Sequence, residues 1–187
     1  MKKLIWLIAT VVVVSCFYAC NKDEDVDLNE YNYWKQQNES WIKEMENLKT
    51  PEGEPYYTKL IPTWNKGAYI LIRYFNDRAE TAGNLVPLYT STVDVRYIGY
   101  NCEGEPFDSS TVDNSYGKLG VRRFAVNELI QGWSIALMDM HVGDTAEIVI
   151  PYDIAYGTTY TGTILPYSAL RFNVRLEDIY LYEASQK

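Results

Sequence analysis

Hydrophobic and polar positions follow several different periods along the chain, and the longest regular pattern lies between residues 31 and 48. Positions spaced by three and four residues fall there on one face of a helix, and all but one are apolar or aromatic: Tyr31, Trp34, Asn38, Trp41, Ile42, Met45 and Leu48. Thr50 and Pro51 end this helix, because a residue before proline disfavours the helical backbone. We interpret the aromatic stripe as a packing face; a binding groove is the alternative.

Strands and turns dominate the pattern after residue 55. Residues 92–100 alternate between apolar and polar positions, as expected for a half-buried strand, and residues 76–84 form a polar loop. Apolar runs bounded by Gly, Pro or Asn predict further strands at 56–61, 68–75, 145–150 and 169–182.

A second helix is predicted over residues 128–140. Its apolar positions share one side, and Gly143 follows where a left-handed residue commonly ends a helix; the positions are Leu129, Trp133, Ala136, Leu137 and Met140. Strands wrapped around one short central helix predict an α+β fold, with the 31–48 helix and the first strands as an N-terminal extension.

The first twenty residues are typical of an export signal. Lys2 and Lys3 precede an apolar run at residues 4–14, which is shorter than the roughly 20 residues of a spanning helix. An uncleaved membrane anchor is the alternative. Small residues followed by cysteine resemble the lipobox of bacterial lipoproteins. We favour Cys20 as the lipidated residue, since an acidic stretch follows it; Cys16 is the alternative.

Charge and composition limit the classes of ligand and of catalytic site that the chain can have. The 187 residues carry 17 Lys and Arg against 25 Asp and Glu, a formal net charge of −8, which argues against nucleic-acid binding. His141 is the only histidine, so a catalytic dyad and a His-rich metal site cannot both be supplied. We therefore predict neither a metal nor another cofactor. With Cys20 lipidated and Cys16 removed, Cys102 is left without a disulfide partner and is expected to be inert.

Short motifs from residue 95 onward occur in a fixed order and spacing. They are VRYIGY at 95–100, GEPFDSS at 104–110, ELIQGW at 128–133, MHVGD at 140–144, AYG at 155–157 and ILPYSALRF at 164–172. Taken together, they resemble the FKBP-type peptidyl-prolyl cis-trans isomerases. The resemblance implies a strongly bent antiparallel β-sheet wrapped around the central helix, with an apolar pocket between them.

The same resemblance implies the site residues. The catalytic set would be Tyr97, Phe107, Asp108, Trp133 and Tyr156, and the substrate-binding set would be Leu129, Ile130, Ile164 and Phe172. Trp133 would form the floor under the substrate proline ring. Tyr156 would bond one substrate carbonyl and the backbone N–H of Ile130 the next one.

Two positions depart from the family pattern or leave it open. Leu165 stands where the family's flap loop usually has the first of two prolines, and an aromatic wall position is open between Phe124 and Arg122. These departures bear on substrate preference.

The sequence thus predicts a prolyl isomerase that is anchored in the cell envelope, at the outer membrane, and that acts on proline-containing segments of exported proteins. A non-catalytic peptide-binding module, either a holdase or a subunit of an envelope assembly, is the alternative. A homodimer through the N-terminal helix is a further hypothesis. The expected division of the chain is a signal at 1–19, an acidic tether at 20–29, an extension at 30–85 and the isomerase domain at 86–187.

Overall fold

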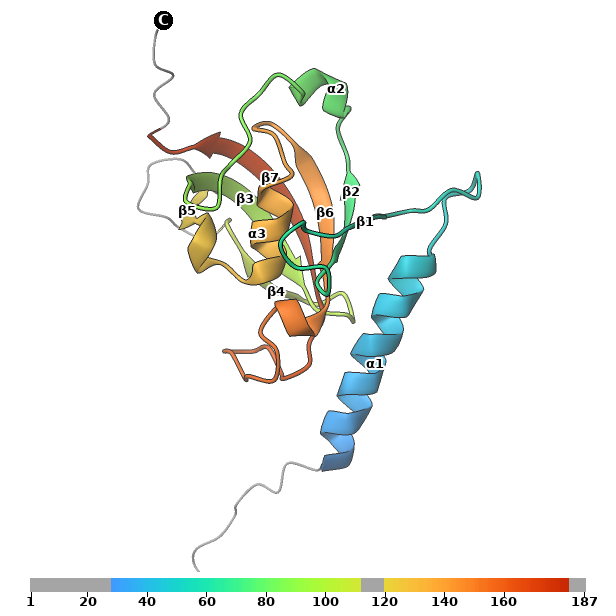
Figure 1. The fold of residues 1–187 in the computed structure, drawn as a ribbon. Coiled ribbons are helices and arrows are strands. Elements are labelled where there is room, and N and C mark those ends of the chain that lie inside the picture. Colours follow the sequence, from blue (N-terminus) through green and yellow to red (C-terminus); the bar gives the residue numbers. More distant parts are fainter. Residues whose placement is uncertain (1–27, 112–119, 182–187) are drawn as a thin grey trace, which may run out of the picture.

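A strongly curved antiparallel sheet runs through the computed structural model, which describes residues 28–111 and 120–181 (Figure 1). Its strand order is β1-β2-β6-β7-β3-β4, and β5 pairs with the first half of β3. The strands are β1 (Thr58–Leu60), β2 (Ile70–Tyr74), β3 (Thr92–Tyr100), β4 (Pro106–Ser109), β5 (Arg122–Ala125), β6 (Thr145–Ile150) and β7 (Leu170–Ile179).

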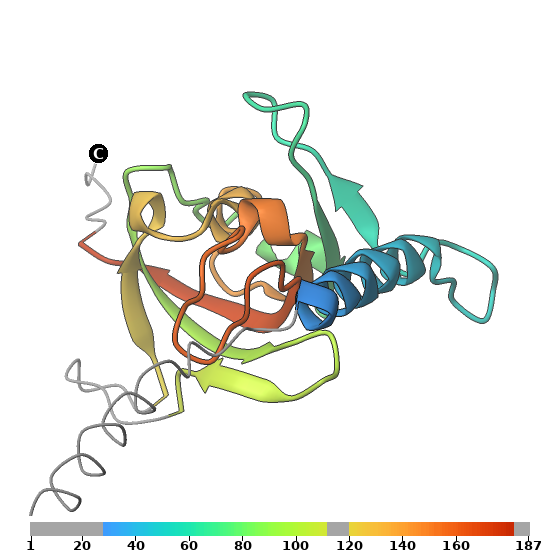
Figure 2. The same ribbon diagram turned by 90° about the horizontal axis from the view of Figure 1, so that it is seen from below.

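Two helices cover opposite faces of this sheet. Figure 1 shows α3 (Gln131–Leu137) inside the curve of the strands, and Figures 1 and 2 show α1 (Leu28–Asn47) outside it. The described residues also contain the short helix α2 (Arg78–Thr81) and two 3-10 turns, η1 (Val126–Glu128) and η2 (Tyr152–Ile154).

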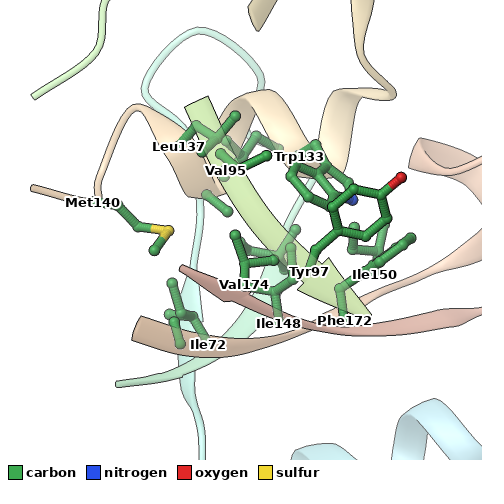
Figure 3. Close-up of a cluster of buried hydrophobic side chains, with 14 of the residues drawn as sticks. Ile72, Val95, Tyr97, Trp133, Leu137, Met140, Ile148, Ile150, Phe172 and Val174 are labelled. Carbon is green, nitrogen blue, oxygen red and sulfur yellow. The ribbon is translucent and has the colours of Figure 1, made fainter. Parts of the chain in front are cut away.

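Alternation along the strands separates the two apolar layers. Ile70 and Ile72 of β2 belong to the inner cluster against α3, whereas Leu71 between them belongs to the outer cluster with Ile42 of α1. Figure 3 shows part of the inner cluster, where side chains of α3 meet those of β2, β3, β6 and β7. A strand with both faces covered buries successive residues, and β6 is accordingly buried at every position after Thr145.

Asn38 is the polar residue in the apolar stripe of α1, and it is fully buried. Its Oδ1 accepts a hydrogen bond from the backbone N–H of Ala169 at 2.8 Å, and its Nδ2 donates to the carbonyl of Trp34. The Trp34 indole donates to Ser168 Oγ at 3.1 Å. These bonds fix α1 to the segment that leads into β7.

A second polar network joins α2 to the turn before β6. The buried carboxylate of Asp144 accepts hydrogen bonds from Thr81 Oγ1, Asn76 Nδ2 and the backbone N–H of His141. Burial raises the pKa of Asp144, but these hydrogen bonds and the nearby Arg78 outweigh it, so the net shift is downward. The 76–84 connection is therefore anchored by charge rather than by apolar contacts.

The predicted fold class is confirmed, and several boundaries differ. The strand 92–100 and the strand 145–150 occur as predicted. The helix predicted at 128–140 is wrong at both ends. Leu129 and Ile130 have extended backbones and separate η1 from α3, and α3 itself ends at Leu137. The loop at 76–84 contains α2, which Asp77 caps by accepting from the N–H of Ala79.

The N-terminal expectations fall mostly outside the described residues. The signal, Cys16, Cys20 and nearly all of the acidic tether lie there, and the division of the chain at residue 86 stays a prediction. Within the described ranges no helix has the length and apolar character that a membrane span requires. The apolar stripe of α1 packs on the sheet of the same chain. A homodimer through this helix stays a prediction, and it would have to use the other faces of α1.

Candidate active site

Trp133 lies at the centre of a pocket on the inner face of the sheet. It is in the first turn of α3, where its backbone N–H donates to the carbonyl of Ile130 at 3.0 Å. The preceding residue, Gly132, brings this turn against β6, since an added Cβ would lie within 2.9 Å of three side-chain carbons of Ile150. The position of the indole is therefore set by contact between the helix backbone and the sheet.

Aromatic rings from four strands gather around the indole. Tyr97 of β3 and Phe172 of β7 each meet it edge to face, with centroids 5.2 Å away. Phe107 of β4 stands edge to face against Phe172 at 5.5 Å, and Phe124 of β5 lies 6.4 Å from the indole. Edge-to-face packing is a favoured arrangement for aromatic pairs, and each ring here holds the next in orientation. Figure 3 shows Tyr97 and Trp133 beside each other at this end of the cluster.

A cavity of about 190 Å³ opens above these rings. It is lined by Tyr97, Phe107, Asp108, Phe124, Glu128, Leu129, Ile130, Trp133, Tyr156 and Phe172. Drug-sized ligands occupy pockets of about 300–1,000 Å³, so this one suits a single small ring. Trp133 itself is only 4% exposed, so its indole forms a floor.

The pocket contains one internal hydrogen bond between side chains. Tyr97 donates its hydroxyl to Asp108 Oδ2 at 2.7 Å, and the other carboxylate oxygen accepts from the N–H of Ser109. Burial and then the bond to Asp108 raise the pKa of Tyr97 well above its ordinary value. The phenol therefore stays protonated and keeps the carboxylate at the rim of the pocket.

Two donors at the pocket remain available for a ligand. Within the described residues, neither the hydroxyl of Tyr156 nor the backbone N–H of Ile130 forms a hydrogen bond. Burial, followed by the charge of Asp108, raises the pKa of Tyr156, so its hydroxyl also remains a donor. The carbonyl of Ile130 accepts from the N–H groups of Trp133 and Ser134, which holds this residue at the start of α3.

The segment that follows the flap loop is held by α1. Ser168, which accepts from the Trp34 indole, itself donates to the carbonyl of Leu165 at 2.7 Å. Ile164 is the predicted site residue that the structure does not bring into the pocket. It packs into the core and lines a second cavity of about 170 Å³, and an isolated bridge pairs it with Thr161.

The other eight predicted site residues line one pocket. Phe124 takes the aromatic wall position that the sequence left open, because its strand pairs with β3 so that Phe124 lies opposite Val93. Glu128 also lines the pocket and was not predicted, although it is the first residue of the ELIQGW motif. Cys102 is a free thiol, and burial raises its pKa to about 11, in line with an inert residue.

The profile of the family described as "FKBP-type peptidyl-prolyl cis-trans isomerase" matches residues 86–177. The "Macrophage infectivity potentiator" of Trypanosoma cruzi is 40% identical over 106 residues, which are 56% of this chain and 52% of that protein. The "FKBP-type 22 kDa peptidyl-prolyl cis-trans isomerase" of Escherichia coli K12 is 39% identical over 50% of this chain and 44% of its own. The chain thus spans about half the length of these two relatives.

A shorter relative is covered almost completely. The "Peptidyl-prolyl cis-trans isomerase FKBP1A" of Xenopus laevis is 37% identical over 98 residues, which are 52% of this chain and 88% of that protein. A solved peptidyl-prolyl cis-trans isomerase from Pseudomonas syringae is 26% identical, with a TM-score of 0.59 over 78% of this chain and 94% of that one. FkpA from Escherichia coli is 22% identical with a TM-score of 0.61 over 81% of this chain and 62% of its own, which shows likeness of fold alone.

Replacing Tyr97 with Phe tests the bond to Asp108. We expect a loss of about 1–2 kcal/mol in unfolding free energy and a three- to tenfold fall in isomerisation of an X–Pro peptide, because the carboxylate is released toward the pocket. Tyr74→Phe is a matched control. Tyr74 donates its hydroxyl to Asp139 Oδ2 at 2.6 Å, and neither residue lines the pocket. It is expected to lose similar stability and keep its activity. Equal activity in both variants would contradict a role for the Tyr97 bond.

Proposed function

The chain belongs to the family of FKBP-type peptidyl-prolyl cis-trans isomerases, and on that premise we propose that it isomerises X–Pro bonds in the pocket above Trp133. The observation that carries the proposal is the open cavity over the indole, ringed by aromatic walls and flanked by two unused donors. A proline ring would rest on Trp133, while the hydroxyl of Tyr156 bonds the carbonyl before the proline and the N–H of Ile130 bonds the next carbonyl along the chain.

The proposed mechanism relies on differences in solvation rather than on a covalent step. Rotation about an amide bond has a barrier of about 18–20 kcal/mol, because conjugation must be broken. In the twisted state the carbonyl is less polarised than in the planar state, so its transfer out of water costs less free energy. An apolar pocket therefore stabilises the twisted amide relative to both planar isomers, and each tenfold in rate requires about 1.4 kcal/mol.

A non-catalytic peptide-binding module is the second candidate. It is favoured by Leu165, which replaces a proline in the flap, and by the close attachment of the flap to α1 through Ser168. Such a module would bind proline-containing segments in the same pocket as a holdase, or as a subunit of an envelope assembly. Measured isomerisation rates separate the two candidates.

We expect the purified chain to accelerate the isomerisation of a short X–Pro peptide. Tyr156→Phe should lower kcat/KM by about two- to tenfold, since one hydrogen bond contributes about 0.5–1.5 kcal/mol. Tyr152→Phe is a nearby control, because Tyr152 packs against Tyr167 and is absent from the pocket lining. Trp133→Ala should abolish the acceleration, with unfolding followed in parallel because Trp133 is buried. A folded chain that gives no acceleration with any X residue would overturn the catalytic proposal in favour of the binding module.

We also propose that the protein is a lipoprotein of the cell envelope, held at the outer membrane through lipidated Cys20, where it assists the folding of exported proteins. Support comes from the basic start, the short apolar run and the acidic stretch after Cys20. Two or more acyl chains make such an anchor durable, since each buried CH₂ contributes about 0.8 kcal/mol.

Fractionation of cells tests the anchor. Cys20→Ala should move the protein from the membrane fraction to the soluble fraction and remove incorporation of labelled palmitate. Cys16→Ala is the control, and it is expected to leave both unchanged. The opposite result, with Cys16→Ala releasing the protein, would assign the anchor to Cys16, and retention of both variants would argue for an uncleaved apolar anchor.

A further inference from the structure

A second hollow, of about 520 Å³, lies beside the isomerase pocket and against α3. Gln131, Ser134 and Met138 line it from one face of that helix. Trp64 and Tyr89 line it from two connections, one between β1 and β2 and one between α2 and β3. Its volume falls within the range of about 300–1,000 Å³ that is typical of ligand sites.

The two aromatic side chains of this groove are more than half exposed. Trp64 is 56% and Tyr89 53% exposed, although large aromatic side chains usually bury much of their surface. Neither ring forms a contact with another aromatic ring among the described residues. Trp64 also lies before residue 86, outside the region that matches the family profile. The groove is therefore built partly by the extension of this chain.

The groove and the isomerase pocket share one wall. Leu129 lines both, Ile130 lines the pocket, and Gln131 lines the groove, so the two hollows meet across three consecutive residues. The N–H of Ile130, which no acceptor in the described residues uses, lies at this junction. A peptide that bonds this N–H on leaving the pocket is directed toward the groove.

We infer that this groove binds apolar or aromatic side chains of the substrate in the few residues that follow the proline. The inference rests on the proposed function, in which Tyr156 bonds the carbonyl before the proline and Ile130 bonds the next carbonyl along the chain. The order of these two bonds sets the direction of the peptide, so its later residues reach Trp64 and Tyr89. The groove gives the enzyme a preference for segments of unfolded chains in which an apolar residue follows proline closely.

Peptides of equal length test the inference with the full chain in detergent. One series carries Phe-Leu after the X–Pro unit, a second carries Ser-Ser there, and a third carries Phe-Leu before it. We expect the KM for the first series to be about five- to twentyfold below that for the other two. The double variant Trp64→Ala, Tyr89→Ala should bring this KM ratio close to one. Tyr33→Ala removes a ring of α1 that is 69% exposed, and the ratio should be unchanged.

Binding of the same peptides, followed by fluorescence anisotropy, separates failure of the inference from failure of the proposed function. Catalysis with no preference among the three series would contradict the proposed role of the groove and leave the proposed isomerase activity supported. Preferential binding of the first series without catalysis would support the groove and overturn the isomerase. A preference that survives in the double variant, or one for Phe-Leu before the proline, would contradict the assignment of Trp64 and Tyr89.

Discussion

The whole site depends on how closely α3 approaches the curved sheet. Gly132 makes this approach possible, because a side chain there would collide with Ile150 of β6. The next residue is Trp133, so the contact that seats the helix also sets the height of the indole. A second close approach occurs at Gly99 of β3, where an added Cβ would lie 2.6 Å from a ring carbon of Phe172 and 2.8 Å from one of Phe107. The missing side chain at Gly132 thus lets the helix contact the sheet, and the one at Gly99 leaves room for two of the aromatic walls.

The extension before residue 86 is part of this architecture rather than an attachment to it. β2 pairs with β6 along four positions, and α1 covers the outer face of the same strands. Through Trp34 and Asn38, α1 also holds the segment that follows the flap. The pocket above Trp133 is therefore lined by residues within the 86–177 match to the family and supported from the other side by residues that precede this match. Differences in substrate preference are expected to originate on the second side.

Sequence reasoning predicted those elements whose side chains obey a strict period. β3 and β6 were predicted at their observed limits, because alternation or continuous burial defines them. The central helix was predicted to begin too early. Leu129 is apolar because it lines the pocket, and it does not belong to a helical face. Phe124 could not be assigned before the pairing of β5 with β3 was known. Trp64 gave no signal at all, because its neighbours on α3 are remote in the sequence and adjacent only in the fold.

The central claim is that the position of α3 creates the catalytic pocket, and replacing Gly132 tests it most directly. Exchange spectroscopy by NMR measures cis–trans interconversion of an X–Pro peptide per folded molecule. The account predicts that Gly132→Ala lowers this rate at least tenfold, that Ile150→Ala in the same chain restores part of it, and that Gly83→Ala, at a position with open space, has no effect. A folded Gly132→Ala protein with the original rate would contradict the account.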